Sequence, residues 1–399
     1  MRSLWPCSRR ASSGGGRCES SRHGDRVVHC CGELRWPTLR LARTSDAEAV
    51  SPHLVGWQKR KAGMVDWFER LTGFKETDYA STRARLVCKD GRLTSLVNGK
   101  SYQTGRLELP KLSELRTRVQ DSACRTGRLG VSLVSGDVRT LHLVPEFAGA
   151  LFQVASQFNL LEMIGPHATP EDGVTIYQHD PTQGPACAIA AGAATIYRNY
   201  FAPVGGESGQ TRDRQLDALA DVGAALKSRL SRGGELWAMT NGYALCTRTG
   251  LETITAILDA SDGDEIDALR GHLRIGLHSD VELTDAGEPR PTVSQAFCSA
   301  LPVAYCSPAP RYWQTFSRLI LEASYEATIW AAVLNATRGS NIALLTSVGG
   351  GAFGNEESWI EDALRRALLL ASSFDLDVRL VSYDRPTETF LRLQDEFGR

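Results

Sequence analysis

A glycine-rich stretch near the C-terminus is the part of the sequence best suited to binding an anion. The apolar run from Ile342 to Val348 is followed by glycines at 349, 350, 351 and 354, and then by an amphipathic helical pattern. Glycine has no Cβ, so a ligand can approach the backbone N–H groups, and a helix N-terminus adds free donors and a positive dipole end. The pattern predicts a strand, a tight turn and a helix that together bind phosphate, with Asn355 as the N-cap.

Two acidic residues leave a second interpretation of this stretch open. Glu356 and Glu357 fall in the first helical turn, where acids are common because of the helix dipole, yet they would repel phosphate unless they point away. The alternative is an ordinary glycine-rich turn between a strand and a helix.

A polar loop from Gln178 to Pro185 holds the other residues that could do chemistry. His179 and Asp180 are adjacent, and this pair of residue types can supply a base and the group that orients it. Cys187 follows at the start of a predicted helix, where the dipole lowers the pKa of a thiol and can make it nucleophilic. The alternatives are a plain loop and a buried thiol.

Composition restricts the class of protein. The chain has 399 residues, 42% of them hydrophobic and 23% charged, which suffices for one large domain or two ordinary ones with a sizeable core. A net charge of -1 gives no direct nucleic-acid signal, and no apolar run reaches the roughly 18 residues that span a bilayer. We expect a soluble protein that does not associate with a membrane.

The cysteines indicate a reducing, intracellular compartment. None of the 10 cysteines form a CxxC pair. Six are scattered singly through apparently structured segments: Cys88, Cys124, Cys187, Cys246, Cys298 and Cys306. This distribution is typical of buried thiols, so no metal site and no cofactor are expected.

The N-terminal segment differs in composition from the rest. Residues 1–45 contain nine arginines, seven serines, no lysine and only three acids. An Arg-rich, Ser-rich and acid-poor segment is typical of an organelle transit peptide. The alternatives are a disordered tail or a wrongly assigned start, so the expected location is cytoplasmic or organellar and residues 1–55 are treated as a tail.

Residues 56–128 predict an accessory region of a helix and a β-meander. Apolar residues at helical spacing cover 57–74, and Asp90-Gly91 and Asn98-Gly99 separate short alternating runs as hairpin turns do. The strands expected on either side are 84–88, 93–97 and 102–109, with a helix at 112–119. The role of this region is not apparent from its residues.

Residues 129–399 alternate strands and helices, which is the α/β pattern. Strands are expected at 129–134, 151–158, 295–305, 342–348 and 378–383. Helices are expected at 186–200, 313–334, 355–368 and 388–397. The segment 213–290, with helices at 216–230 and 251–258 and strands within 235–246 and at 273–283, is punctuated by charge and glycine and is predicted to be a surface insertion.

Three motifs in this order resemble the macro domain family, whose members are ADP-ribose-binding α/β modules. The family's first strand ends in Gly-Asp-Ile-Thr, and here 136–139 reads Gly-Asp-Val-Arg. Its next strand ends in Asn-Ala-Ala-Asn, and 156–159 reads Ser-Gln-Phe-Asn. Its Thr-Gly-Val-Phe/Tyr-Gly loop is matched by Gly-Gly-Ala-Phe-Gly at 350–354. The resemblance covers about 129–399 and implies a three-layer α/β/α fold with a mixed sheet.

The resemblance also implies a set of binding residues for ADP-ribose or an ADP-ribosylated protein. Asp137 would accept a hydrogen bond from the adenine amino group, and Asn159 would bind the distal ribose. Gly184 would belong to a second phosphate-facing loop. The diphosphate would be wrapped by Gly350, Gly351, Ala352, Phe353 and Gly354. The alternatives are that Asp137 only caps the turn after its strand and that Asn159 only satisfies backbone groups.

Two departures from the family pattern affect catalysis. Hydrolysing members carry Gly-Gly-Gly-Val-Asp-Gly-Ala-Ile, and its alignment with residues 184–189 places Ala186 where the catalytic aspartate belongs. Ser156 also replaces the first asparagine of the second motif. An ADP-ribosyl glycohydrolase therefore remains a hypothesis, in which His179 and Asp180, in a loop that would overhang the distal ribose, replace the usual apparatus.

Other functions fit the sequence less well or differently. A catalytically inactive scaffold, with the β-meander carrying a protein partner, is the alternative from another class. A Rossmann enzyme is disfavoured because its G-x-G-x-x-G belongs at the first strand of a βαβ unit, whereas this glycine stretch lies near the C-terminus. No GxxxxGK[ST] is present, which excludes a P-loop NTPase.

Overall fold

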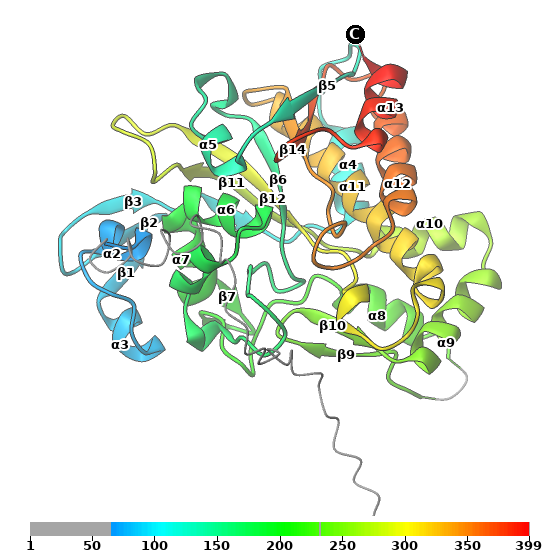
Figure 1. Ribbon diagram of the computed structural model, residues 1–399, viewed down its shortest axis with the longest axis horizontal. Coiled ribbons are helices and arrows are strands. Elements are labelled where there is room, and N and C mark those ends of the chain that lie inside the picture. Colours follow the sequence, from blue (N-terminus) through cyan, green and yellow to red (C-terminus); the bar gives the residue numbers. More distant parts are fainter. Residues whose placement is uncertain (1–64, 231–232, 399) are drawn as a thin grey trace, which may run out of the picture. The chain divides into compact units, whose positions relative to one another are not determined.

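The fold is α/β, as predicted. The computed structural model describes residues 65–230 and 233–398, so the predicted tail lies outside the described residues. Its centre is a 7-stranded mixed sheet with the order β4-β11-β12-β6-β13-β14-β5 (Figure 1). In that order the strands are Arg106–Glu108, Gly276–Glu282, Thr292–Cys298, Leu151–Ala155, Ile342–Leu345, Asp377–Ser382 and Gly130–Ser135.

The direction of the strands determines where loops can meet. β12, β6, β13, β14 and β5 run parallel, whereas β11 and β4 are antiparallel to their neighbours. The carboxyl ends of the parallel strands therefore share one edge of the sheet, which is where α/β proteins bind ligands. The three motifs follow β5, β6 and β13, so the topology brings all of them to this edge.

Helices cover both faces of the sheet (Figure 1). On one face, α11 (Gln314–Ala336) contacts β6, β12 and β13, and α13 (Glu388–Phe397) contacts β5. α4 (Leu112–Asp121) and α12 (Glu357–Leu370) pack against α11 on this side. On the other face, α6 (Gln183–Ala190) contacts β6 and α7 (Gly192–Tyr200) contacts β11, with α5 (Val138–Leu141) beside α6. The layers are α/β/α.

The longest helix forms the centre of the core, as its apolar stripe predicts. In α11, Phe316, Ile320 and Ala323 are buried, and Trp313 just before it is buried as well. α12 turns Trp359, Ile360 and Leu364 toward the same cluster. Burial of such apolar surface contributes about 25 cal/mol per Å² and is the main force that holds the helices to the sheet.

The N-terminal region contains the expected meander but is not separate from the sheet. α2 (Trp67–Thr72) and α3 (Tyr79–Ala84) precede β1 (Leu86–Lys89), β2 (Arg92–Ser95) and β3 (Ser101–Gln103), which pair antiparallel. The strand predicted at 102–109 is divided, because Gly105 has a φ of +75° and an added Cβ would clash with Ser279. The second part, β4, pairs with β11 at the edge of the main sheet.

The middle of the chain is only partly an insertion. Most of its elements lie outside the main sheet: β7 (Pro203–Val204), β8 (Glu207–Ser208), α8 (Ala220–Lys227), the hairpin of β9 (Trp237–Thr240) and β10 (Tyr243–Cys246), α9 (Arg248–Asp259) and α10 (Gly263–Gly271). β11, which the sequence assigned to the insertion, is a strand of the main sheet between β4 and β12. α10 was not predicted.

The alanine-rich helix predicted at 186–200 is two helices. The chain breaks at Ala191, where φ is -109° and ψ is 54°. Gly192 begins α7 in close contact with α2, since an added Cβ would clash with Leu71 and Trp67, and its N–H donates to the Thr284 hydroxyl at 2.9 Å. The break is therefore caused by packing against a distant helix.

Candidate functional site

The two central parallel strands separate before they reach the ligand edge. β6 and β13 pair only through Leu151 with Ala343 and Phe152 with Leu344. On its other side β6 is paired with β12 along its whole length, from Leu151 to Ala155. The last residues of β6 therefore have no strand on the side of β13.

Two glutamine side chains fill the space between these strands. The Gln153 amide accepts from the N–H of Thr346 at 3.1 Å and donates to the Thr328 hydroxyl at 3.1 Å. The Gln183 amide accepts from the N–H of Ala155 at 3.0 Å and donates to the carbonyl of Gln153 at 2.8 Å. These side chains replace main-chain pairing and fix the start of α6, and the sequence analysis missed both.

The glycine loop after β13 is compact and has free N–H groups. Gly349 and Gly354 adopt positive φ, 78° and 70°. Asn355 N–H donates to the Gly349 carbonyl at 2.9 Å, and the Gly354 N–H donates to the Gly351 carbonyl at 3.0 Å. Within the described part of the chain, no protein acceptor is found for the N–H groups of 349, 351, 352 and 353. The loop can therefore donate to a ligand.

Asn355 does not cap the following helix, which corrects the sequence prediction. The N-cap of α12 is Glu356, whose side chain makes no capping hydrogen bond. The Asn355 side chain is buried and donates from Nδ2 to the Leu301 carbonyl at 2.9 Å and to the Gly349 carbonyl at 3.3 Å. Through its bond to the Leu301 carbonyl, Asn355 instead fixes the glycine loop to the segment after β12, where Gly349 also lies against Ala300.

An aromatic cluster joins the glycine loop to two other segments. The ring centroid of Phe353 lies 5.4 Å from that of Tyr243 in β10 and 5.6 Å from that of Tyr305 after β12, and the two tyrosines are 5.2 Å apart. Burial and, to a smaller extent, the nearby Asp180 carboxylate raise the pKa of Tyr305. Burial, Tyr305 and Asp180 also raise the pKa of Tyr243. The Asp180 carboxylate is therefore close enough to interact electrostatically with both tyrosines.

Asp137 lies at the same edge and caps a helix. It is exposed, it is the N-cap of α5, and its carboxylate accepts from the N–H of Arg139 at 2.8 Å. Arg139 in turn forms an ion pair with Asp285 at 2.5 Å. A carboxylate can accept further hydrogen bonds, so capping leaves Asp137 able to bind an exocyclic amino group.

Asn159 is buried beneath the β9–β10 hairpin. Its side chain has 0% exposure, donates to Gln215 at 2.8 Å and accepts from the N–H of Leu161 at 3.1 Å. Gly242 in the turn of the hairpin packs directly on the Asn159 amide. The described contacts are those of a residue that supports the loop after β6, and the predicted contact with a ribose stays a prediction.

The other candidate residues of the loop before α6 have separate surroundings. His179 is exposed at the end of the 3₁₀ helix η3 (Thr175–His179), and its ring lies 3.5 Å from the Gln178 amide rather than on Asp180. The Asp180 carboxylate accepts from the N–H of Thr182 at 2.8 Å, one residue before α6. The structure therefore gives no His–Asp hydrogen bond between them.

Gly184, Ala186 and Cys187 lie in the first turns of α6. Gly184 is buried, and an added Cβ would be 3.2 Å from the carbonyl carbon of Ala155 and closer still to its oxygen. Burial raises the pKa of the Cys187 thiol well above its ordinary value, so it is protonated at neutral pH. The nucleophile hypothesis for Cys187 is wrong, because desolvation outweighs the helix dipole.

A buried ion pair beneath α6 was not found from the sequence. Glu162 and Arg198 are 1% and 0% exposed, and their side chains are 3.4 Å apart. Burial raises the pKa of Glu162 to about 7, and Arg198 opposes this rise. Arg198 also donates to the Leu160 carbonyl at 3.1 Å and lies over the Phe297 ring at 3.9 Å. In the sequence, Glu162 and Arg198 are single charges in apolar segments, and only the fold brings them together.

Two properties of the described residues bear on partners and cofactors. No helix among them is long and apolar enough to cross a membrane. Within residues 65–230 and 233–398, no group of three or more His, Cys, Asp or Glu side chains could hold a metal ion.

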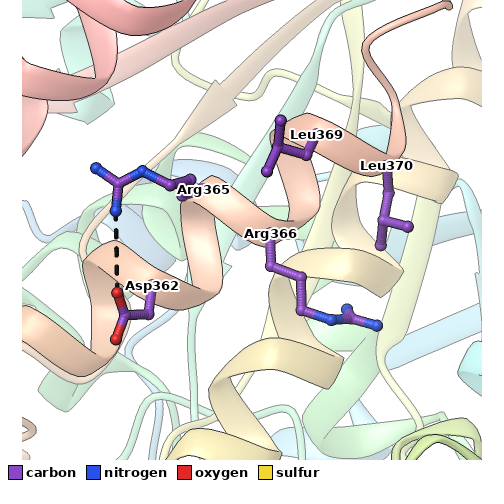
Figure 2. A pocket seen from close by; sticks show the side chains of 5 residues that line it. All are labelled: Asp362, Arg365, Arg366, Leu369 and Leu370. Atoms are coloured by element: carbon purple, nitrogen blue, oxygen red, sulfur yellow. Dashed lines mark ion pairs between the residues drawn. The ribbon is translucent and has the colours of Figure 1, made fainter.

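A surface hollow of about 380 Å³ lies on α12, away from the residues predicted to bind a ligand. Figure 2 shows its lining side chains, which are Asp362, Arg365, Arg366, Leu369 and Leu370. Arg365 pairs with Glu361 at 2.9 Å and Arg366 with Glu326 at 2.5 Å, so both guanidinium groups are already engaged. The hollow does not include the glycine loop.

Comparison with known proteins gives matches among solved structures only. No protein-family model matches the sequence, and no curated protein matches it. The chain is similar to poly(ADP-ribose) glycohydrolase from Deinococcus radiodurans in complex with ADP-ribose, at 14% identity, with 73% of this chain and 92% of that chain covered and a TM-score of 0.39. It is also similar to poly(ADP-ribose) glycohydrolase from Thermomonospora curvata, at 14% identity, with 77% and 93% covered and a TM-score of 0.36.

Proposed function

We propose that the chain binds ADP-ribose or a related ADP-ribosyl ligand at the edge of the sheet where the parallel strands end. The observation that carries this proposal is the glycine loop, whose N–H groups at 349, 351, 352 and 353 have no acceptor among the described residues. Gly349 and Phe353 are partly buried, where an unpaired N–H is costly, and Gly351 and Ala352 are exposed and accessible to a ligand. The oxygens of a diphosphate would accept from these N–H groups without a metal.

The other end of the ligand has a candidate partner on the same edge. Asp137, after β5, is exposed and retains acceptor capacity for the adenine amino group. Phe353 is half-buried beside Tyr243 and Tyr305 and offers an apolar surface for a ribose. An acidic acceptor, free loop amides and an apolar surface are the three kinds of group that an adenine diphosphate ribose requires.

Titration of residues 65–399 with ADP-ribose by calorimetry tests the proposal, and Gly351 supplies a matched pair of variants. Gly351 has no atom within 4 Å of an added Cβ and its φ is not positive, so both alanine and glutamate are compatible with the fold. Gly351→Glu is expected to abolish binding through charge repulsion, whereas Gly351→Ala keeps it. Asp137→Ala is expected to weaken binding. A folded wild-type protein that does not bind ADP-ribose would contradict the proposal and favour the scaffold alternative.

Hydrolysis of an ADP-ribosyl linkage is a second candidate function, favoured by the position of Asp180. Asp180 lies between η3 and α6, and its carboxylate interacts electrostatically with the two tyrosines that pack on Phe353 of the glycine loop. From there it could orient a water against the anomeric carbon. Asp180→Asn is expected to keep ADP-ribose binding and to abolish release of ADP-ribose from an ADP-ribosylated protein. Release of ADP-ribose by the variant at the wild-type rate would exclude a catalytic role for Asp180. The same assay on Asn159→Ala tests the other predicted residue.

A further inference from the structure

One acidic residue of the N-terminal region reaches the loop that leads into the proposed site. Glu76 lies between α2 and α3, outside the main sheet, and is half-buried. Both of its carboxylate oxygens accept from the N–H of Val174 at 2.9 Å, and one also accepts from the N–H of Thr175 at 2.6 Å. The other accepts from the Tyr200 hydroxyl at 2.7 Å.

The backbone of the loop is shaped to receive this carboxylate. Gly173 has a φ of 81°, and an added Cβ would collide with the Glu76 carboxylate. A glycine is therefore needed for the acid to approach the next two N–H groups, which are the first of η3. Hydrogen bonds to a charged acceptor are about twice as strong as neutral ones, so this contact is a strong fixing point for the loop.

The fixed loop continues directly into the candidate site. η3 ends at His179, Asp180 follows, and α6 begins at Gln183, whose side chain closes the end of β6. Tyr177 within η3 is buried and accepts from the N–H of Glu162 at 3.2 Å, which holds the opposite side of the same turn. Without Glu76, two N–H groups at the start of η3 lose their acceptor, and the loop is held to the N-terminal region by the apolar packing of Val174 and Tyr177 instead.

We infer that Glu76 is a positioning residue for the proposed ligand, acting on its distal-ribose end through the loop 173–182. The inference rests on the proposed function, because that loop is the one predicted to overhang the distal ribose. It also assigns a role to the N-terminal region, which is to supply from outside the sheet the charge that orders a loop of the site. The glycine loop, which would hold the diphosphate, has no contact with Glu76 among the hydrogen bonds of the described residues.

A comparison of two ligands tests this inference. The affinities of ADP-ribose and of ADP, which lacks the distal ribose, are measured by calorimetry for the wild type and Glu76→Ala. We expect Glu76→Ala to weaken ADP-ribose by about tenfold or more and to leave ADP within about twofold, since misplacement of a positioning loop is felt only by the groups it contacts. A general loss of folding would weaken both ligands alike.

Glu171, in η2 (Pro170–Asp172) just before that loop, supplies a control of the same chemistry. Its carboxylate also accepts from a backbone N–H, that of Arg212 at 2.8 and 2.9 Å, but it does not contact η3. Glu171→Ala is expected to bind both ligands as the wild type does. If Glu76→Ala does not fold, Glu76→Gln is used, which has one acceptor oxygen and is expected to show a smaller loss confined to ADP-ribose.

The outcomes separate this inference from the proposed function. A wild type that binds neither ligand contradicts both. A wild type that binds ADP-ribose, with Glu76→Ala equal to it, leaves the proposed function standing and overturns the role of Glu76. Equal weakening of both ligands by Glu76→Ala, or the same selective loss in Glu171→Ala, also overturns it, because neither result is specific to the distal ribose or to η3.

Discussion

Replacement of Gly184 by alanine should destabilise the protein through a backbone clash at the end of β6. The added Cβ would lie 3.2 Å from the Ala155 carbonyl carbon and under 3.0 Å from its oxygen, whereas carbon–oxygen contacts are normally about 3.3–3.6 Å. The position of the Cβ is fixed by the backbone of α6, and the carbonyl that it meets belongs to the backbone of β6, so no flexible side chain can move aside. Overpacking of this kind costs about 3 kcal/mol.

The cost can be read from thermal unfolding. With an unfolding entropy of about 2 cal/mol/K per residue, about 3 kcal/mol corresponds in a chain of 399 residues to a decrease in Tm of about 4 °C. Unfolding is followed by circular dichroism for Gly184→Ala and for Gly351→Ala, which has no atom within 4 Å of its added Cβ and should keep the wild-type Tm. A Gly184→Ala protein with the wild-type Tm would show that the approach of α6 to β6 is looser than described, and would refute the packing explanation for this glycine.

Three further predictions concern buried and partly buried polar groups. Burial raises the pKa of Glu162 from 4.5 to about 7, so the contribution of its protonated form to stability is full below pH 4.5 and is lost as the pH rises toward 7. Glu162→Gln should therefore flatten this part of a plot of Tm against pH, and an unchanged slope would contradict the shift in pKa. Hydrogen bonds, above all from Arg392, lower the pKa of Glu361 from 4.5 to about 2, so the contribution of its carboxylate to stability is present above pH 4.5 and is lost as the pH falls toward 2. Glu361→Gln should lower Tm at pH 7 but not at pH 2, and equal losses of Tm at both pH values would refute this role of Glu361. Asn355→Ala removes the donor that fixes the glycine loop, and thermal unfolding should show a decrease in Tm equivalent to about 1–2 kcal/mol. Calorimetry should show a lower affinity for ADP-ribose, and wild-type affinity would exclude this role of Asn355.

Regular elements with long periodic patterns could be predicted from the sequence. The apolar stripe of α11, the strand β5 and the turns of the β1–β3 meander all depend on residues close together in the chain. The edge at which the three motifs meet could also be predicted in outline, since each motif follows a strand and parallel strands end together, whereas its binding of a ligand stays a prediction.

Features that depend on distant contacts could not be predicted. The division of β3 from β4 requires the approach of Ser279 to Gly105, and the break before α7 requires α2 against Gly192. Asn355 has the residue type of an N-cap, but a carbonyl more than fifty residues away, that of Leu301, engages its side chain instead. Local propensity gives the type of an element, whereas these contacts decide where it ends and which way a polar side chain turns.

The site residues divide in the same way. Gln153 and Gln183 are polar side chains in segments that otherwise look like a buried strand and a helix start. Nothing in their sequence neighbours indicates that the Gln183 side chain bonds to the backbone of β6 or that the Gln153 side chain accepts from the N–H of Thr346. Glu76 is separated by 98 residues from the N–H it accepts from, so its connection to the loop exists only in the fold.

The short pairing of β6 with β13 gives the sheet an unusual mechanical property. Its two residue pairs join a block of β5, β14 and β13 to a block of β6, β12, β11 and β4, and beyond them the Gln153 side chain accepts from the N–H of Thr346 just after β13. Side-chain hydrogen bonds can be exchanged for others without breaking a ladder of main-chain bonds. Compliance is therefore expected along this line, which α11 spans on one face, and Gln153→Ala would remove the side-chain hydrogen bond between the blocks while each block keeps its own register.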